Sequence, residues 1–277
     1  MNANLAPALD AIRNGGRVAV LTGAGISAES GIPTFRGQGG YWTVGSREYH
    51  PQELATWAMF SRHPERVWPW YLYRRSICAN AQPNAGHDAL VRLEKHLRDR
   101  FTLITQNVDG LHVRAGNSRE RTYEIHGNLH RMRCAESCCP EQWAIPEGVS
   151  TPKRNGTLAS QDTSLLRCPR CDAWTRPHVL WFDECYDEEK YRYESSLNVA
   201  VQADLLIVVG TSGATNLPMQ VGAIVARRGA AIIDINPAEN PFSQLAQRVP
   251  SGVALTGSAG AILPTLADHL LNGSTDE

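Results

Sequence analysis

Four short apolar runs of this 277-residue chain each end in a polar or glycine-rich cluster, and this pattern limits the fold more than any other feature. The runs are residues 18–21, 101–104, 205–209 and 231–235, and the clusters that follow them are 22–27, 105–109, 210–212 and Asn236. Such runs are typical of parallel strands covered on both faces, whose ligands bind beyond the carboxyl ends. One cluster alone is explained by an ordinary strand-to-helix turn. Together they predict a nucleotide site in an α/β doubly wound, Rossmann-like sheet.

Charge and length exclude several classes of protein. The chain carries 27 basic and 28 acidic residues, so electrostatics give no argument for a nucleic-acid or membrane partner. No apolar stretch approaches the ~18 residues of a membrane span, and the N-terminal segment has Asp10 and no apolar signal core. We expect a cytoplasmic enzyme with either one large domain or a main domain and a smaller module. The oligomeric state stays open.

The segments between the runs alternate with them as in a doubly wound fold. Helices are predicted at 5–13, 86–98, 188–202 and 216–228, and two short aromatic-rich helices are predicted within 51–78. A long mobile loop is expected from Gly31 to about Tyr41, because that segment is rich in glycine and proline. Residues 134–178 lack sustained periodicity, and the tail after Leu271 should be disordered.

The loop after the first run fits a dinucleotide-binding pattern. Residues 23–28 read Gly-Ala-Gly-Ile-Ser-Ala, which matches G-x-G-x-x-G/A and permits close approach of the backbone to a pyrophosphate. Glycine-rich turns are common, so this match alone is weak. The usual acidic residue about twenty positions later is missing, and residues 41–45 stand there instead. A dinucleotide must therefore be held differently here.

A longer match identifies a family. Residues 23–37, Gly-Ala-Gly-Ile-Ser-Ala-Glu-Ser-Gly-Ile-Pro-Thr-Phe-Arg-Gly, resemble the signature loop of the sirtuins, the NAD-dependent protein-lysine deacylases. Further blocks that resemble the family are 105–112, 126–127, 176–182, and 210–212 with Asn236. The resemblance implies one catalytic domain. Its Rossmann-like part would comprise about 1–30, 79–126 and 179–271, and its small module about 31–78 (helical) and 127–178 (zinc-binding).

The resemblance also implies roles for individual residues. His126 would be the general base, which suits the near-neutral pKa of imidazole, whereas a lone histidine before glycine is otherwise more simply a core or surface residue. Asn107 and Asp109 would complete the catalytic set, with Gln106 and Asn107 on the ribose and Asp109 on the nicotinamide amide. Phe35 and Arg36 would order over NAD and exclude water. The implied NAD-binding set is Gly23, Ala24, Gly25, Ser27, Ala28, Glu29, Ile32, Pro33, Thr34, Phe35, Arg36, Trp42, Gln106, Asn107, Asp109, His126, Gly210, Thr211, Ser212, Asn236, Pro237, Ser258 and Ala259.

The cysteines predict a structural zinc site. Five of the seven cysteines lie between Cys134 and Cys171, and in an intracellular chain such clustering indicates metal before disulfides. Cys168 and Cys171 form a C-x2-C pair, whereas Cys134 can pair with Cys138 or Cys139. We select Cys138 because it needs the smaller insertion. Four thiolates would close the site and hold the module together, and the alternative is a set of free thiols.

Two features concern the acyl-lysine substrate. Tyr71 and Arg74 resemble the Tyr-x-x-Arg acyl pocket of one sirtuin class, and on a helix they share a face that can bind a carboxylate. This predicts malonyl, succinyl or glutaryl lysine, the alternative being a core tyrosine and a surface arginine. Val179, Trp181 and Phe182 match the strand that binds the peptide. Asp183 stands where the family usually has glycine, and it can crowd the peptide or add negative charge beside it.

Three classes of function remain. The first is an NAD-dependent protein deacylase that releases nicotinamide and O-acyl-ADP-ribose. The second is an NAD glycohydrolase or ADP-ribosyltransferase on the same scaffold, which a peptide groove closed by Asp183 would favour. The third is an NAD-binding module without turnover, which the presence of His126, Asn107 and Asp109 disfavours.

Overall fold

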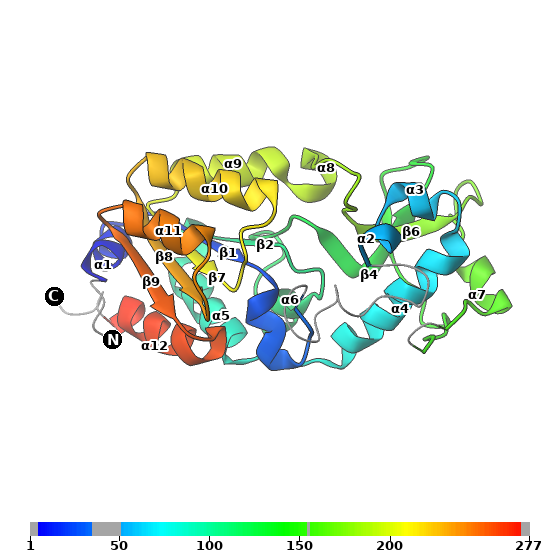
Figure 1. Ribbon diagram of the computed structural model, residues 1–277, viewed down its shortest axis with the longest axis horizontal. Helices are drawn as coiled ribbons and strands as arrows, with labels where there is room; N and C mark the ends of the chain where they lie inside the picture. The colour runs from blue at the N-terminus through cyan, green and yellow to red at the C-terminus, as the bar shows by residue number, and fades with distance from the viewer. Residues whose placement is uncertain (1–4, 35–50, 154–155, 273–277) are drawn as a thin grey trace.

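The computed structural model describes residues 5–34, 51–153 and 156–272. Its larger sheet has six strands in the order β3-β2-β1-β7-β8-β9, and its smaller sheet has three in the order β5-β4-β6 (Figure 1). The large sheet is parallel throughout, and the small sheet is antiparallel. The predicted α/β doubly wound architecture is confirmed.

The four apolar runs are the central strands of the large sheet, as predicted. They are β1 (Val18–Thr22), β2 (Phe101–Thr105), β7 (Leu205–Val209) and β8 (Ala231–Asn236). The sequence analysis missed the edge strands β3 (Thr122–Glu124) and β9 (Gly252–Thr256), whose residues are mostly half-buried or exposed. An edge strand packs less completely than a central one, so it lacks the continuous apolar run that reveals the others.

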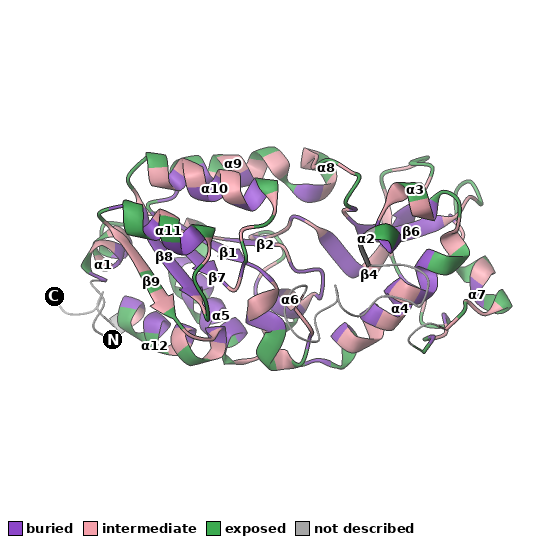
Figure 2. Ribbon diagram, in the orientation of Figure 1, coloured by how far each residue is buried: buried purple, intermediate pink, exposed green. Residues whose placement is uncertain are grey.

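Helices cover both faces of the large sheet. One core lies under α1 (Ala6–Arg13), α5 (Ala85–Leu97) and α12 (Ala259–Asn272), and the other under α9 (Tyr193–Gln202), α10 (Asn216–Arg227) and α11 (Pro241–Arg248). Figure 2 shows the buried strands between these two helical layers. The short helices η1 (Ala24–Ser30), η3 (Arg98–Arg100), α6 (Leu111–Ala115) and α8 (Glu188–Tyr191) lie in the connections. β1 has β2 on one side and β7 on the other, so the order in which strands are added to the sheet reverses at β1. In open sheets of this type ligands bind in the crevice at such a reversal, beyond the carboxyl ends of the strands.

A third core lies in the small module. It is built from α2 (Pro51–Leu54), α3 (Trp57–Phe60), α4 (Pro64–Asn80), β4 (Gly127–Cys134), β5 (Gln142–Ala144), α7 (Ser160–Leu165) and β6 (Thr175–Val179). Trp68 and Trp181 are almost fully buried there. The module lies to the right in Figure 1.

The prediction of two short helices within 51–78 is wrong. The structure has three helices, and α4 spans 17 residues with Pro69 inside it. Tertiary contacts offset the helix-breaking effect of this proline, because Trp68 beside it is buried and donates from Nε1 to Thr175 O over 2.8 Å. The boundaries predicted for the two parts of the chain stay a prediction.

Two expectations fall wholly or partly beyond the described residues. Most of the expected mobile loop lies in residues 35–50, and the expected disordered tail lies almost entirely in 273–277. Among the helices that the structure describes, none is long and apolar enough to cross a membrane.

Candidate active site

The loops after β1 and β7 touch each other at the crevice. The Gly25 N–H donates to Gly210 O over 2.8 Å, and a Cβ on Gly25 would lie 2.6 Å from Gly210 Cα. Gly210 has a φ of +61°, which side chains rarely adopt. Glycines are therefore needed here for contact between the two loops.

Polar side chains from η1, which follows β1, and from the segment after β2 form a buried cluster here. Ser27 Oγ donates to Asp109 Oδ2 over 2.8 Å and accepts from Asn107 Nδ2 over 3.1 Å. The Leu111 N–H donates to Asp109 Oδ1 over 2.8 Å. Burial raises the pKa of Asp109, while the hydrogen bonds from Leu111 and Ser27 act against that rise. Two residues that were predicted for catalysis therefore lie together with a residue predicted to bind NAD.

Gln106 connects this cluster to the β7 loop. Its Nε2 donates to Thr211 Oγ1 over 2.8 Å, and its Oε1 accepts from Thr215 Oγ1 over 2.9 Å. Thr211 is buried and the neighbouring Ser212 is exposed. The structure thus brings the strand-end residues of β1, β2 and β7 into one hydrogen-bonded group.

His126 lies at the edge of this group and is half-buried. Its Nδ1 lies 2.9 Å from Gln106 O, and a carbonyl only accepts, so Nδ1 carries the proton and Nε2 is the unprotonated nitrogen. Burial lowers the pKa of His126 to about 4, although the bond to Gln106 raises it. The imidazole is therefore neutral at pH 7 and able to accept a proton at Nε2.

The next residue joins the two sheets. Gly127 pairs with Val179 of β6, and the Leu180 N–H donates to His126 O over 3.0 Å. Gly127 has a φ of +86°, and a Cβ there would lie 2.0 Å from His178 O. Glycine is thus required after His126, because only glycine lets the histidine backbone approach β6 so closely.

The remaining predicted NAD-binding residues include Glu29, beside the start of α12, and Asn236, at the end of β8. Glu29 accepts from Ser258 Oγ over 3.0 Å and from the Gly260 N–H over 2.6 Å, so its carboxylate holds the start of α12. Asn236 donates to Asp234 Oδ1 over 2.7 Å at the end of β8. The others are buried Ile32, half-buried Ala24, Pro33 and Thr34, exposed Ala28 and Pro237, and buried Ala259. Phe35, Arg36 and Trp42 lie outside the described residues.

Tyr71 and Arg74 lie together in the core of the small module. Their exposed fractions are only 2% and 4%, and the Arg74 guanidinium carbon lies 5.7 Å from the centre of the Tyr71 ring. Trp181 Nε1 donates to Tyr71 Oη over 2.7 Å, so the phenol proton can be donated elsewhere. Burial raises the pKa of Tyr71 to about 12. A core tyrosine beside a surface arginine, the simpler alternative, does not describe this pair, because the arginine is buried too.

Asp183 turns toward α3. Its two carboxylate oxygens accept from the N–H groups of Trp57 and Ala58 over 2.7 and 3.0 Å. The Phe182 N–H beside it donates to Ala55 O over 3.0 Å, and the Phe182 side chain is 57% exposed. The carboxylate that replaces glycine thus satisfies backbone donors at a helix start.

The sequence analysis missed Tyr186 and Thr215. Tyr186 Oη lies 2.7 Å from His126 Nε2, although the two residues are 60 positions apart. No local motif marks Tyr186, whereas Thr215 stands directly before a predicted helix, where a hydroxyl commonly caps. That position was a usable signal for Thr215 alone.

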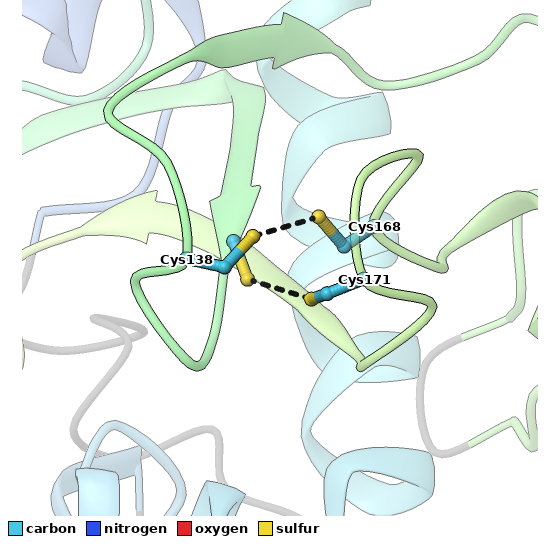
Figure 3. Close-up of side chains that lie close together, drawn as sticks. Cys138, Cys168 and Cys171 are labelled. Atoms are coloured by element: carbon cyan, nitrogen blue, oxygen red, sulfur yellow. Dashed lines mark hydrogen bonds between the residues drawn. The ribbon is translucent and has the colours of Figure 1, made fainter.

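The four predicted cysteine ligands form one cluster (Figure 3). The sulfur atoms of Cys134, Cys138, Cys168 and Cys171 all lie within 4.8 Å of one another. The pairs Cys134–Cys171 and Cys138–Cys168 are each 3.6 Å apart, close to the roughly 3.8 Å expected of thiolates around one tetrahedral zinc. Cys139 is not one of these four, although its sulfur atom lies 3.5 Å from that of Cys138. The four cysteines can therefore bind one structural zinc ion.

Comparison with known proteins agrees with this geometry. A model of the Sir2 family matches residues 23–216. An NAD-dependent protein deacylase of Leptospira interrogans is 39% identical over 92% of this chain and 94% of its own length. One from Thermus thermophilus is 38% identical over 91% of this chain and 92% of its own length. The chain belongs to the Sir2 family, the sirtuins, as the resemblance predicted.

Solved structures give the same assignment. A Sir2 homologue in complex with NAD is 35% identical, has a TM-score of 0.79, and is matched over 99% of this chain and 96% of that one. A Sir2 homologue in complex with 2'-O-acetyl ADP ribose is 36% identical, with a TM-score of 0.79 over 98% of both chains. A Sir2 complex with a p53 peptide and NAD is 26% identical, with a TM-score of 0.74 over 96% and 98% of the two chains.

Proposed function

We propose that this protein is an NAD-dependent protein-lysine deacylase that releases nicotinamide and O-acyl-ADP-ribose. The observation that carries the proposal is the position of His126. Its side chain is held by Gln106 of the strand-end cluster, and its backbone is bonded to Leu180 beside the predicted peptide strand. A candidate base therefore stands between a dinucleotide crevice and a place where a peptide can lie.

NAD supplies a ribose carbon that becomes electrophilic as nicotinamide leaves, so that the oxygen of an acyl amide can bond to it. The residues of the crevice fit this co-substrate. Buried Asn107, Asp109 and Ser27 offer donors and acceptors for the ribose and the carboxamide. The loop glycines and Thr211 lie where a pyrophosphate is held in related sheets. Phe35, Arg36 and Trp42 keep their roles by resemblance alone.

His126 is the general base in this proposal. With Nδ1 bonded to Gln106 O, its Nε2 accepts a proton from a substrate hydroxyl after nicotinamide has left. The low pKa of His126 keeps the base neutral throughout the physiological range.

For the acyl group we propose malonyl, succinyl or glutaryl lysine. Desolvation of the terminal carboxylate is costly unless a cation meets it, and buried Arg74 beside Tyr71 supplies a guanidinium and a hydroxyl donor. Arg74→Met should lower kcat/KM on succinyl peptides by orders of magnitude and spare or improve it on matched acetyl peptides. Tyr71→Phe is the milder companion. Equal loss on both peptides would make Arg74 structural and remove the acidic-acyl assignment.

The second candidate is an NAD glycohydrolase or ADP-ribosyltransferase. Its main argument was a peptide groove closed by Asp183, and the bonds from Asp183 to α3 weaken that argument. We therefore prefer the deacylase, with acyl-lysine proteins as substrates. We place these substrates in the cytoplasm, as the sequence analysis expects for the enzyme.

One experiment tests the function. The protein should be incubated with NAD and a panel of acetyl, malonyl, succinyl and glutaryl peptides, and the products separated by mass. O-acyl-ADP-ribose supports the deacylase, whereas free or protein-bound ADP-ribose without loss of the acyl group supports the alternative. His126→Ala should abolish deacylation and leave NAD binding largely intact, and a variant with unchanged turnover would remove His126 from the mechanism.

A further inference from the structure

His126 is held at both nitrogens of its ring. Nδ1 donates to Gln106 O over 2.9 Å, so Nε2 is the unprotonated nitrogen. The second bond joins Nε2 to Tyr186 Oη over 2.7 Å, and in this tautomer the phenol must be the donor. The lone pair that a general base uses is therefore already bonded to a tyrosine hydroxyl.

Tyr186 is itself fixed by its surroundings. Its ring stacks on Tyr193 with ring centres 6.3 Å apart, and the Thr215 side chain lies within reach of its hydroxyl. Each hydroxyl has one proton: that of Tyr186 goes to His126 Nε2 and that of Thr215 goes to Gln106 Oε1. Gln106 and Thr215 stand at the dinucleotide crevice, so these contacts place the Tyr186 hydroxyl beside it.

We propose that Tyr186 is a further catalytic residue, the proton relay between a substrate hydroxyl and the base His126; this rests on the proposed deacylase function. The Tyr186 O–H bond breaks as its proton forms an N–H bond at His126 Nε2. At the same time Tyr186 Oη takes the proton of the substrate hydroxyl, whose oxygen keeps the electron pair and bonds to the acyl carbon, while the π electrons of that carbon's double bond to the lysine nitrogen move to the nitrogen. Tyrosine ends neutral and His126 ends as the imidazolium, so charge and protons balance.

The surroundings of the phenol suit a relay of this kind. Burial raises the pKa of Tyr186 to about 12, although the nearby Thr215 side chain acts against it, so the hydroxyl stays protonated and ready to donate. No tyrosinate has to form, because Tyr186 gains one proton as it loses another. Removal of a general base typically costs 10²–10⁴-fold in rate, and we expect loss of the relay to cost at least about tenfold.

Tyr186→Phe tests the relay, and Tyr193→Phe is its matched control. Both variants lose one hydroxyl from the same aromatic stack, but the Tyr193 hydroxyl donates to Gln220 Oε1 and not to His126. The first readout is the ¹⁵N NMR signal of His126 Nε2 in the protein without NAD. It should move toward the value of an unbonded lone pair in Tyr186→Phe and stay unchanged in Tyr193→Phe.

The second readout separates the two chemical steps. Exchange of labelled nicotinamide into NAD reports the first step, which needs no base, and O-acyl-ADP-ribose formation needs both steps. Tyr186→Phe should slow product formation at least about tenfold and leave exchange near wild type. Four results for Tyr186→Phe would each overturn the relay. They are an unchanged ¹⁵N signal, faster product formation, a rate of product formation equal to that of Tyr193→Phe, and an equal loss of exchange and product formation. If the wild-type protein forms no O-acyl-ADP-ribose, the proposed function itself fails. If His126→Ala keeps wild-type turnover, the base and the relay both fail; if only Tyr186→Phe behaves as wild type, the relay alone fails.

Discussion

The large sheet and the small module hold their functional residues by different means. In the large sheet, strands buried on both faces end at one edge, and polar side chains there bond to neighbouring loops, as Asn107 Nδ2 does to Gly23 O. The small module has only a three-stranded sheet, and individual side-chain contacts between short elements hold much of it together. Buried Arg176 pairs with Glu184, and its guanidinium carbon lies 3.5 Å from the centre of the Trp181 ring. The four cysteines converge from the end of β4, the loop after it and the loop before β6.

This difference teaches where each part is vulnerable. Positions in the parallel sheet are set by many equivalent backbone bonds, so one side chain can change without moving its neighbours far. The small module depends on a few individual contacts, such as the Arg176–Glu184 ion pair and the cysteine cluster, so loss of one of them should destabilise the whole module. His126 and Gly127 lie at the junction, and substitutions there should affect both parts.

The largest effect is expected at the cysteine cluster. Wild-type protein should contain about one zinc ion per chain, and Cys168→Ser should lose the metal and the folded module, since structural zinc contributes about 10–16 kcal/mol in small zinc domains. Metal analysis and hydrogen exchange of β4 and β6 measure this. Cys139→Ser is the control and should keep its zinc, because Cys139 lies outside the cluster. Zinc retained by Cys168→Ser would contradict the site.

The junction should be the next most sensitive place. Gly127→Ala forces a Cβ against His178 O at a φ of +86°, so we expect a loss of at least about 3 kcal/mol in the free energy of unfolding. Gly229→Ala is the matched control, since Gly229 has a φ of +71° but no atom within 4 Å of the added Cβ. It should lose only about 1 kcal/mol. Similar losses in urea denaturation would show that strain, and not the close approach, explains Gly127.

Acid should weaken both parts through buried neutral histidines. Burial lowers the pKa of His87 in α5 to about 4; burial, together with nearby Arg133, lowers the pKa of His178 in β6 to about 3. The unfolded chain takes up these protons near pH 6.5, so stability is complete above that pH and falls as the pH drops toward 4.

Each histidine should contribute at most about 1.4 kcal/mol per pH unit in this window. Unfolding in urea at pH 7, 6, 5 and 4.5 measures the slope, and His87→Gln and His178→Gln should each reduce it. A slope that neither substitution changes would show that other groups cause the acid sensitivity.

The smallest effect is expected at the contact between α3 and Asp183, in the segment after β6. Asp183→Ala leaves the Trp57 and Ala58 N–H groups without their carboxylate, which should cost about 1 kcal/mol, as loss of a helix cap does. Asp183→Asn keeps an acceptor and should cost less. KM for acyl peptides should change little in either variant. A large fall in KM for Asp183→Ala would instead place this carboxylate in the peptide groove.

Much of this protein follows from local sequence. The four central strands were predictable because a strand buried on both faces needs an uninterrupted apolar run, and β1 and β7 are buried at every position. The glycine loop and the Cys168/Cys171 pair followed from short motifs with fixed spacing, and the roles of the strand-end residues followed from the family resemblance. The spacing of the first cysteine pair left Cys138 and Cys139 as alternatives.

Tertiary structure alone decided the rest. The 17-residue length of α4 depends on burial of Trp68 against β6, and the use of Glu29 depends on the start of α12 arriving beside it. The bond between Tyr186 and His126 joins residues 60 positions apart. Periodicity and motifs indicate the local structure of one segment, whereas contacts between distant residues form only when separate segments pack together. The sequence by itself therefore determined the sheet and the family and indicated a candidate base, and only the packed fold decided which hydroxyl is bonded to His126.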